Sequence, residues 1–311
     1  MSSPIVLTII TPVYNGEKHI SETIKSIISA NIKINYEHIV INDGSTDLTS
    51  SILNQYKEKI IILSQENLGE SAAVNCGLMR SKGQFILVVN ADDPLLTGEL
   101  INQGVKILIS NPSIVAVYPD WKIISDSNET KKIKILPEYS DELMIGRCRC
   151  LPGPGTLFRK DVALRIGGRS TDWKFVSDYE FWLRMSRQGV ITRLPGVLAQ
   201  WRESVSSTSL SQRGLSMANE RIKVIESFLL ENRLPLSLQR KARGNSHYLA
   251  ARLTFFDPSI PGRTMLFKAF INRRGWPEEA KLHVVVYLIL MPFSTFLVKR
   301  LSKLAQRFTN D

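Results

Sequence analysis

The chain has few cysteines and histidines, and neither set has the spacing of a metal site. Its three cysteines are Cys76, Cys148 and Cys150. An odd number, with two of them a single residue apart, argues against a disulfide framework and favours a reducing, cytoplasmic setting. The four histidines are scattered through the sequence without the close pairs typical of zinc ligands. A disulfide-rich secreted domain and a zinc enzyme are therefore poor interpretations.

Two phosphate-binding patterns are also missing. Neither G-x-G-x-x-G nor G-x-x-x-x-G-K-[ST] follows the first apolar run, residues 5–10. A dinucleotide-dependent oxidoreductase and a P-loop nucleotidase each need one of these loops to hold phosphate, so both are excluded. A nucleotidyltransferase would normally carry a glycine-rich, basic loop at the same place, and Tyr14-Asn15-Gly16 is not one. That class stays open only as a less favoured alternative.

Long hydrophobic runs are scarce. No charged segment precedes the apolar run 5–10, so we expect no secretory signal. The apolar run 282–298 is interrupted by His283 and Pro292, and it falls short of the roughly 20 residues that a spanning helix needs. Basic residues flank this run, which favours attachment to an anionic membrane surface. A buried hydrophobic helix is the second interpretation, and a membrane-spanning helix is the least favoured. We therefore expect a cytoplasmic protein, peripheral at the inner face of the cell membrane.

The chain has an excess of positive charge within an ordinary globular composition. Its 311 residues are 43% hydrophobic, and 40 Lys and Arg against 29 Asp and Glu give a formal net charge of +11. This length can bury one large core or two smaller ones. The charge points to phosphate-bearing partners such as nucleotides or lipid headgroups. Nucleic acid is disfavoured, because no aromatic platform or recognised motif accompanies the charge.

The first hundred residues alternate between strand and helix patterns. Apolar, β-branched runs predict strands at residues 5–10, 38–41, 60–63 and 85–89. Such alternation is typical of a parallel sheet that helices cover on both faces. Polar residues follow each run, and ligands of parallel sheets bind beyond the carboxyl ends of the strands. The sequence therefore predicts one crevice built from four loops.

The second hundred residues are less regular. We expect a helix at 100–110, strands at 114–118 and 121–124, and a hairpin or loop at 125–134. A Pro- and Gly-rich turn at 151–155 precedes a short helix that Gly167 and Gly168 close. Another helix begins near Ser177 or Asp178, either of which could cap it. Beyond residue 201 the sequence becomes helical, basic and rich in leucine.

Three carboxylates follow the predicted strands. Asp43 comes after the second, and Asp92 and Asp93 come after the fourth. They would repel one another and a diphosphate unless a divalent cation sat between them. Mg²⁺ and Mn²⁺ prefer carboxylate and phosphate oxygens and tolerate few protein ligands. The pattern therefore predicts Mn²⁺ or Mg²⁺ bridging an anionic ligand.

Five motifs follow one another over about residues 5–201. They are Thr11-Pro12-Val13-Tyr14-Asn15, Asn42-Asp43-Gly44-Ser45-Thr46-Asp47, Asn67-Leu68-Gly69 with Asn75, Asn90-Ala91-Asp92-Asp93, and Ser177-Asp178-Tyr179-Glu180 with Trp182. In order and spacing they resemble the motifs of family 2 glycosyltransferases of the GT-A fold. The resemblance implies an α/β fold with a Rossmann-like, mostly parallel central sheet flanked by helices. It also implies inverting transfer of a sugar from a nucleotide sugar.

The resemblance implies a role for each matching position. Nucleotide binding falls to Thr11, Pro12, Val13, Tyr14, Asp43, Asn67, Gly69, Asn75, Asn90 and Ala91. Asp92 is implied as the metal ligand, with Asp93 as a less certain second, and Asp178 as the general base. Arg202 is a candidate contact to the pyrophosphate. Trp182 is assigned to the core rather than to the site, because its helix is amphipathic.

The sequence also departs from the family pattern. Asn90 replaces the first acid of the DxD motif, which removes one charge from the predicted metal site. Ser177, Val74 and Ser204 stand where the family often has Glu, Arg and His. These changes leave the donor's identity open, and they motivate an alternative in which the chain is a catalytically silent nucleotide-binding subunit of a glycan assembly complex.

The sequence thus predicts two domains and one reaction. A catalytic domain spans residues 1–205, with a nucleotide-sugar half at 1–110 and an acceptor half at 111–205, and a basic helical region spans 206–311. The expected enzyme is a hexosyltransferase that moves a sugar, most plausibly from a UDP-sugar, to a hydroxyl of a polysaccharide or lipid-linked saccharide. The sugar, the linkage and the oligomeric state are left open.

Overall fold

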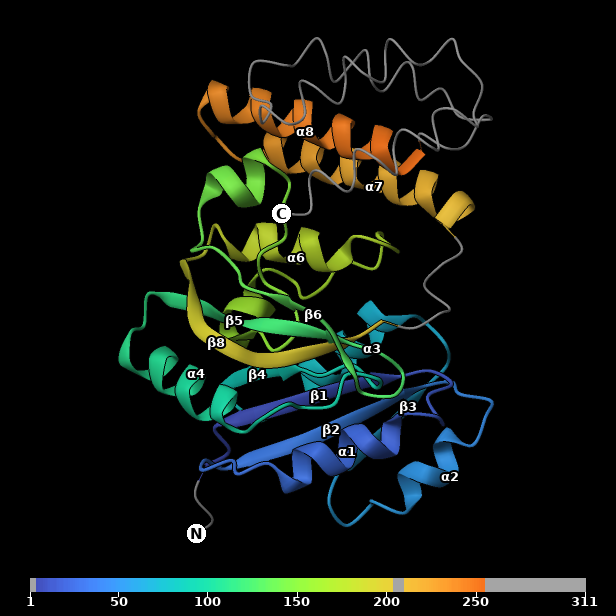
Figure 1. Ribbon diagram of the computed structural model, residues 1–311. Coiled ribbons are helices and arrows are strands. Elements are labelled where there is room, and N and C mark those ends of the chain that lie inside the picture. The colour runs from blue at the N-terminus through green and yellow to red at the C-terminus, as the bar shows by residue number, and fades with distance from the viewer. Residues whose placement is uncertain (1–3, 204–209, 255–311) are drawn as a thin grey trace. The chain divides into compact units, whose positions relative to one another are not determined.

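The computed structural model describes residues 4–203 and 210–254 (Figure 1). The segment 282–298, for which we predicted membrane attachment, and the predicted domain boundary after residue 205 both lie outside these residues. The chain divides into two compact units, one built from residues 4–140 with 150–203 and the other from 141–149 with 210–254. Each is described separately below.

Four parallel strands form the first part of the sheet. They are β1 (Leu7–Val13), β2 (Tyr36–Asp43), β3 (Ile61–Gln65) and β4 (Phe85–Val88), in the order β3-β2-β1-β4. These are the four strands that the apolar runs predicted. The helices α1 (Ile20–Ser29), α2 (Thr49–Asn54), α3 (Glu70–Arg80) and α4 (Glu99–Ser110) follow them in turn. The carboxyl ends of β1, β2 and β4 therefore lie along one edge.

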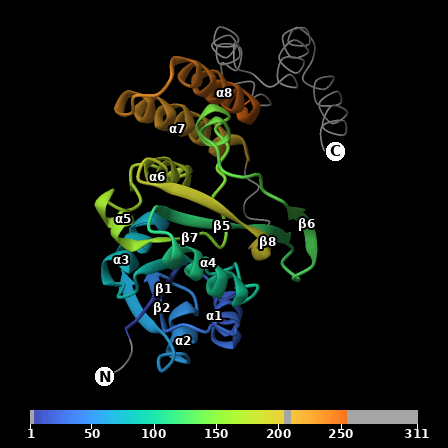
Figure 2. The same ribbon diagram turned by 90° about the vertical axis from the view of Figure 1, so that its left-hand side faces the viewer.

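Helices cover both faces of these strands. Side chains alternate along a strand, so Leu7 and Ile9 join the cluster that contains Leu100 and Val105 of α4. Ile10 faces the other way and lies against α3, where Gly77 has no room for a Cβ, because that atom would lie 2.7 Å from Ile10 Cγ2. Figures 1 and 2 show α1 and α2 on one side of the strands and α3 on the other.

The sheet continues with strands of mixed direction. Antiparallel β7 (Leu157–Arg159) joins β4 to β5 (Ile114–Ile124), which also pairs antiparallel with β6 (Thr130–Lys134) and parallel with β8 (Val190–Arg202). The helices α5 (Lys160–Arg165) and α6 (Ser177–Met185) complete this unit. The predicted mixed, mostly parallel α/β architecture of GT-A type is confirmed.

Three local predictions were wrong. The two strands predicted at 114–118 and 121–124 are one strand, because β8 pairs with both parts and the register shifts near Pro119. The long strand β8 was not predicted, since Pro195 and Gly196 interrupt its apolar pattern. Helix α6 begins at Ser177 as expected, but neither Ser177 nor Asp178 caps it: the N-cap residue is Val176, with no side-chain cap bond.

The second unit is helical. It consists of the π-helical turn η1 (Glu142–Gly146) and the helices α7 (Leu210–Glu231) and α8 (Leu236–Thr254). Lys241 of α8 bonds both carboxylate oxygens of Glu142, and Asn245 donates to the carbonyl of Gly146. No helix within the described part of the chain has the length and apolar character needed to cross a membrane.

Candidate active site

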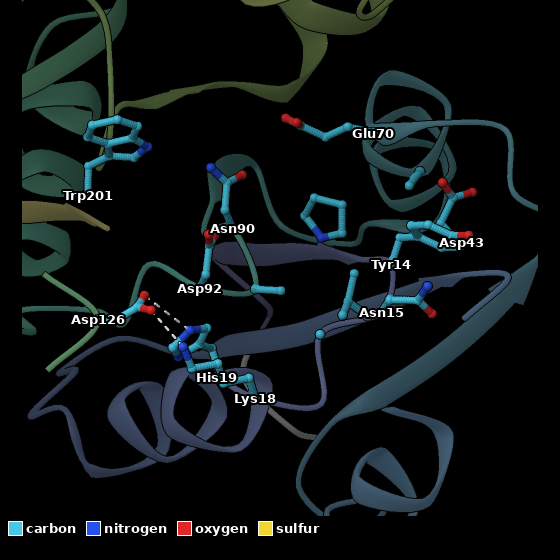
Figure 3. Close-up of a pocket in the computed structure, with 15 residues that line it drawn as sticks. Tyr14, Asn15, Lys18, His19, Asp43, Glu70, Asn90, Asp92, Asp126 and Trp201 are labelled. Carbon is cyan, nitrogen blue, oxygen red and sulfur yellow. Dashed lines mark hydrogen bonds and ion pairs between the residues drawn. The ribbon is translucent and has the colours of Figure 1, made fainter. Parts of the chain in front are cut away.

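The carboxyl ends of β1, β2 and β4 surround a hollow of about 730 Å³ in the first unit, which we call the larger hollow. Predicted site residues that line it are Pro12, Val13, Tyr14, Asp43, Asn90, Ala91 and Asp92. Figure 3 shows Asp43 and Tyr14 at one end, and Asn90, Asp92 and Trp201 at the other. Predicted residues from three separate loops, after β1, β2 and β4, are thus brought together at the predicted edge of the sheet.

The loop after β1 is fixed by the loop after β2. Asn15 adopts a left-handed conformation (φ 50°), and its backbone N–H donates to Ser45 Oγ. Its side-chain oxygen accepts from the backbone N–H of Thr46, and the N–H of Gly16 donates to Thr49 Oγ1. Asn tolerates this backbone conformation better than most residues. These bonds hold Tyr14, which is half-exposed, at the rim of the hollow.

Asp43 is the most tightly held carboxylate of the larger hollow. It is only 3% exposed, and Oδ1 accepts hydrogen bonds from Gln65 Nε2 and the N–H of Leu68, while Oδ2 accepts from the N–H of Gly69. Gly69 has φ 90°, which favours glycine. Asn67 and Gly69, predicted to bind nucleotide, therefore belong to the loop that fixes Asp43 and do not line the hollow.

Thr11 lies beneath the larger hollow. It is fully buried, and its Oγ1 is 2.9 Å from Nε2 of buried His38. Burial lowers the pKa of His38 to about 3, so this imidazole is neutral at pH 7. The predicted nucleotide contact by Thr11 does not fit this position, because the side chain is covered and paired with His38.

The side chains of the two adjacent acids after β4 lie in different surroundings. Asp92 lines the larger hollow, and burial raises the pKa of its carboxyl. Asp93 is buried behind it, where it accepts from the N–H of Arg202 at 2.6 Å and from Asn90 Nδ2. Burial, and then the charge of Asp92, raises the pKa of Asp93 to about 7. Asp93 is outside the lining, which argues against its predicted role as a metal ligand.

The position of Arg202 argues against its predicted contact to the pyrophosphate. Its side chain is 0% exposed, and all three guanidinium nitrogens donate to protein oxygens. The acceptors are the carbonyls of Asp92, Ser125 and Asp126 and the carboxylate of Glu22. Four of its five N–H groups are bonded and the side chain is fully buried, so a pyrophosphate cannot reach this guanidinium. Arg202 instead joins the Asp92 loop to the β5–β6 hairpin.

Three residues that sequence reasoning missed also line the larger hollow. Lys18 Nζ bonds Asp126 Oδ2 at 2.6 Å, and His19 Nε2 lies 3.7 Å from Asp126 Oδ1 (Figure 3). Burial and then the charge of Arg202 lower the pKa of His19. The hydrogen bond from Lys18 lowers the pKa of Asp126. Lys18 and His19 directly follow the first motif, but nothing in the sequence joins Asp126 to them.

A second, smaller hollow of about 300 Å³ adjoins the larger one, because Glu70, Asn90 and Trp201 line both. Asp178 lines it and is exposed. Its Oδ1 accepts from the N–H of Tyr179 at 2.7 Å. The three acids on which the sequence interpretation rested thus occupy two adjoining spaces, with Asp43 and Asp92 in one and Asp178 in the other.

Aromatic side chains form part of the smaller hollow. Trp182 is 5% exposed and packs edge-on against Phe158 and Phe181, in agreement with its assignment to the core. Trp201 was not predicted as a site residue. It lies edge-on to Trp121, with 6.3 Å between ring centroids, and borders both hollows. Its position follows from strand β8, which sequence reasoning missed.

Asn75 was predicted to bind nucleotide, but in the structure its side chain bonds a neighbouring loop. Its Nδ2 donates to the carbonyl of Arg169 at 2.7 Å, and its Oδ1 accepts from the N–H of the same residue at 2.8 Å. Asn75 therefore fixes the loop after α5, and it lines neither hollow. Arg169, which it holds, lines the smaller hollow.

The described residues hold no group of three or more His, Cys, Asp and Glu side chains that could bind a metal ion. Asp92 is the carboxylate that best suits a cation, because it lines the hollow and, in this part of the chain, takes no hydrogen bond from another residue's donor. Hard divalent cations accept such sparse protein ligation when ligand oxygens complete the shell. The residues present therefore fit a cation that arrives with an anionic ligand.

Comparison with known proteins places this chain in a family. The family model described as Glycosyl transferase family 2 matches residues 8–166, and the chain belongs to this family. An uncharacterized glycosyltransferase of Rickettsia prowazekii is 33% identical over 199 residues, which cover 60% of this chain and 59% of that protein. The E. coli protein named UDP-Glc:alpha-D-GlcNAc-diphosphoundecaprenol beta-1,3-glucosyltransferase WfaP is 28% identical over 192 residues, 60% of this chain and 73% of its own length.

Solved structures share the fold. S. aureus TarS 1-349 in complex with UDP-GlcNAc matches with a TM-score of 0.60 at 16% identity, over 86% of this chain and 89% of that one. The Pyrobaculum calidifontis mannosyltransferase PcManGT, in complex with GDP-Man and Mn2+, matches with a TM-score of 0.57 at 16% identity, over 96% of this chain and 89% of that one. At such identities the likeness shows the fold alone.

Proposed function

We propose that this chain is a metal-assisted, inverting glycosyltransferase that uses a nucleotide sugar. The observation that carries the proposal is the pair of adjoining hollows, with Asp92 in the larger and Asp178 in the smaller. A volume of about 730 Å³ suits a nucleotide sugar, and the smaller space suits an acceptor saccharide. The name of the E. coli relative, which specifies UDP-Glc, supports a UDP-sugar as donor.

The residues divide the chemistry between the two hollows. Asp178 takes the proton from the acceptor hydroxyl, whose oxygen then bonds to the anomeric carbon as the bond from that carbon to the diphosphate breaks. The bonding electrons leave on the diphosphate. A bound Mn²⁺ or Mg²⁺ would neutralise charge on that leaving group. Asp92 would hold the cation, and Asp43, Pro12 and Tyr14 would surround the nucleobase.

The acceptor and the place of action complete the proposal. The E. coli relative's name specifies a saccharide linked through a diphosphate to undecaprenol. We infer a polysaccharide or lipid-linked saccharide as acceptor here, used at the inner face of the cell membrane. The basic composition of the chain suits such a surface.

The proposal is tested by binding and by turnover. A thermal-shift screen of nucleoside diphosphates should raise the melting temperature with a uridine ligand, and more so with Mn²⁺ present, because ligands stabilise the folded state by mass action. Purified protein should also transfer or hydrolyse a UDP-sugar. Binding without any turnover would support a silent nucleotide-binding subunit instead. Absence of both, across a panel of nucleotide sugars, would refute the proposal.

A further inference from the structure

Three arginines near the two hollows differ in how many hydrogen bonds they make. Each guanidinium nitrogen of Arg202 donates to a protein oxygen. The same holds for Arg184, which bonds Glu180 and two loop carbonyls. In Arg169 only Nη1 donates, to Glu70 Oε1 at 2.7 Å, and the described residues offer its guanidinium no other acceptor. The guanidinium groups of Arg202 and Arg184 thus make four hydrogen bonds each and that of Arg169 makes one, so Arg169 has by far the most donors to spare.

The spare donors lie in an unusual setting. The Arg169 side chain is only 11% exposed, yet it lines the smaller hollow beside Asp178. A guanidinium has five N–H donors, and the spare donors of Arg169 are not among the buried side-chain atoms without a partner, so they are open to a ligand in the hollow. Carboxylates and phosphates fit its planar fork best, through paired charge-assisted hydrogen bonds. Arg169 therefore presents donors suited to an oxyanion at the wall of the smaller hollow.

The Arg169 backbone is fixed before any ligand binds. The Asn75 amide bonds both its N–H and its carbonyl. Gly168, the preceding residue, has φ 71°, and a Cβ there would lie 2.4 Å from Asn75 Oδ1. Arg184 Nη2 donates to the carbonyl of Gly168 at 2.8 Å. Restraints of this kind reduce the entropy lost when a ligand binds.

The charges around the smaller hollow suit an exchange of partners. Lys174 also lines it and supplies a second cation. Glu70, the partner of Arg169, is 59% exposed, so its carboxylate can turn to solvent at little cost. A ligand oxyanion could therefore replace Glu70 on Arg169 while Glu70 becomes hydrated.

We propose that the smaller hollow takes an acceptor saccharide bearing an oxyanion, which Arg169 binds in place of Glu70, with Asn75 as the positioning residue. The inference rests on the proposed function, because it treats this hollow as the acceptor site. The oxyanion could be the diphosphate of a lipid-linked saccharide or the carboxylate of an acidic sugar. Both present the same chemistry to Arg169, and the choice of acceptor separates them.

The test measures transfer from a UDP-sugar to N-acetylglucosamine in three forms: an alkyl diphosphate, a neutral alkyl glycoside, and a neutral alkyl glycoside extended by a uronic acid. We expect the KM of an anionic form to be at least tenfold below that of the neutral form. A lower KM for the diphosphate than for the uronate identifies the lipid-linked source, and the reverse order identifies an acidic saccharide.

Variants of the two members of the Arg169–Glu70 ion pair should change the KM for the anionic acceptor in opposite directions. Arg169→Gln should raise the KM for the anionic acceptor about tenfold or more and change that for the neutral acceptor little, while Arg169→Lys should restore part of the loss. Glu70→Gln should lower the KM for the anionic acceptor, because it frees Arg169. Arg165→Gln is the matched control, since Arg165 is exposed on α5 and, within the described residues, pairs with Asp161 alone.

Asn75→Leu tests the positioning role. It should raise the KM for the anionic acceptor and leave kcat on the neutral acceptor near that of the wild type, a split that a general loss of stability would not produce. Equal use of charged and neutral acceptors by the wild type would overturn the inference, and so would use of none of them by protein that still hydrolyses the UDP-sugar. Protein that neither binds nor hydrolyses nucleotide sugars would overturn the proposed function, and the inference with it.

Discussion

The two hollows are built in different ways. The larger one lies at the ends of β1, β2 and β4, and bonds from backbone N–H groups to side chains of the neighbouring loop fix part of its wall. The smaller one depends on side chains that join distant segments, such as Asn75 with Arg169 and Phe158 with Trp182. A binding site that follows directly from parallel strands thus adjoins one that requires specific tertiary contacts. The first is expected to tolerate changes in its outer walls better than the second.

Asp178→Asn is expected to have the largest effect and separates the roles of the hollows. Removing a general base should lower kcat about 10²- to 10⁴-fold, because Asn cannot take the acceptor's proton. Affinity for the nucleoside diphosphate, measured by calorimetry, should stay near that of the wild type. Asp161→Asn, exposed on α5, is the control. Equal losses of binding and turnover would show that Asp178 is not the base.

Arg202→Met is expected to lower the free energy of unfolding by about 3–5 kcal/mol, because it removes a buried guanidinium from its partners. Urea unfolding measures the loss, with Arg165→Met at an exposed position as control. Folded Arg202→Met protein at low temperature should still bind the nucleoside diphosphate. A stable variant that has lost affinity would restore the direct pyrophosphate contact that burial argues against.

Asp92→Asn tests the larger hollow alone. The carboxamide keeps the shape but removes the charge that would hold a divalent cation, so affinity for the nucleoside diphosphate in Mn²⁺ should fall about 10- to 100-fold. Affinity without metal should change much less. The ratio of the two dissociation constants is the measurement, and the same ratio in wild type and variant would exclude Asp92 as the ligand.

His38→Gln tests the floor of the larger hollow through pH. The pKa of His38 is about 3 in the folded protein and near 6.5 when unfolded, so the stability that its neutral form provides is present above pH 6.5 and is lost as pH falls toward 3. Wild type should lose up to about 1.4 kcal/mol per pH unit over that window relative to the variant. Denaturant unfolding from pH 7 to 4 measures the difference, and parallel curves would contradict it.

The smallest expected effect concerns the wall of the smaller hollow. Gly167→Ala and Gly168→Ala both place alanine at positive φ, at a cost of about 1–2 kcal/mol each. Only Gly168→Ala also brings a Cβ against Asn75, whereas Gly167 has open space. Gly168→Ala should therefore be the less stable of the two by thermal unfolding, and the only one that raises the KM for the acceptor. Equal thermal stability and equal KM values in the two variants would show that the contact between Gly168 and Asn75 does not shape the acceptor site.

Sequence reasoning succeeded best where the structure is local. The four apolar runs predict β1 to β4, and Asp43 ends β2 and Asp92 follows β4, because polar residues there end the strands. It was weaker beyond residue 111, where strand β8 contains Pro195 and Gly196 and pairs with a partner 75 to 78 residues earlier in the chain. Periodicity gives no information about such a partner.

The sequence alone determined the family, the parallel strands and the order of the site loops, because these depend on hydrophobic pattern and on motifs contiguous in the chain. Tertiary structure decided which polar side chains face a ligand. Asp93 accepts from Arg202 across 109 positions, and Asn75 bonds Arg169 across 94. Burial and hydrogen-bond satisfaction, which depend on packing, direct Asp93 and Arg202 inward and leave Asp92 and Arg169 at the hollows.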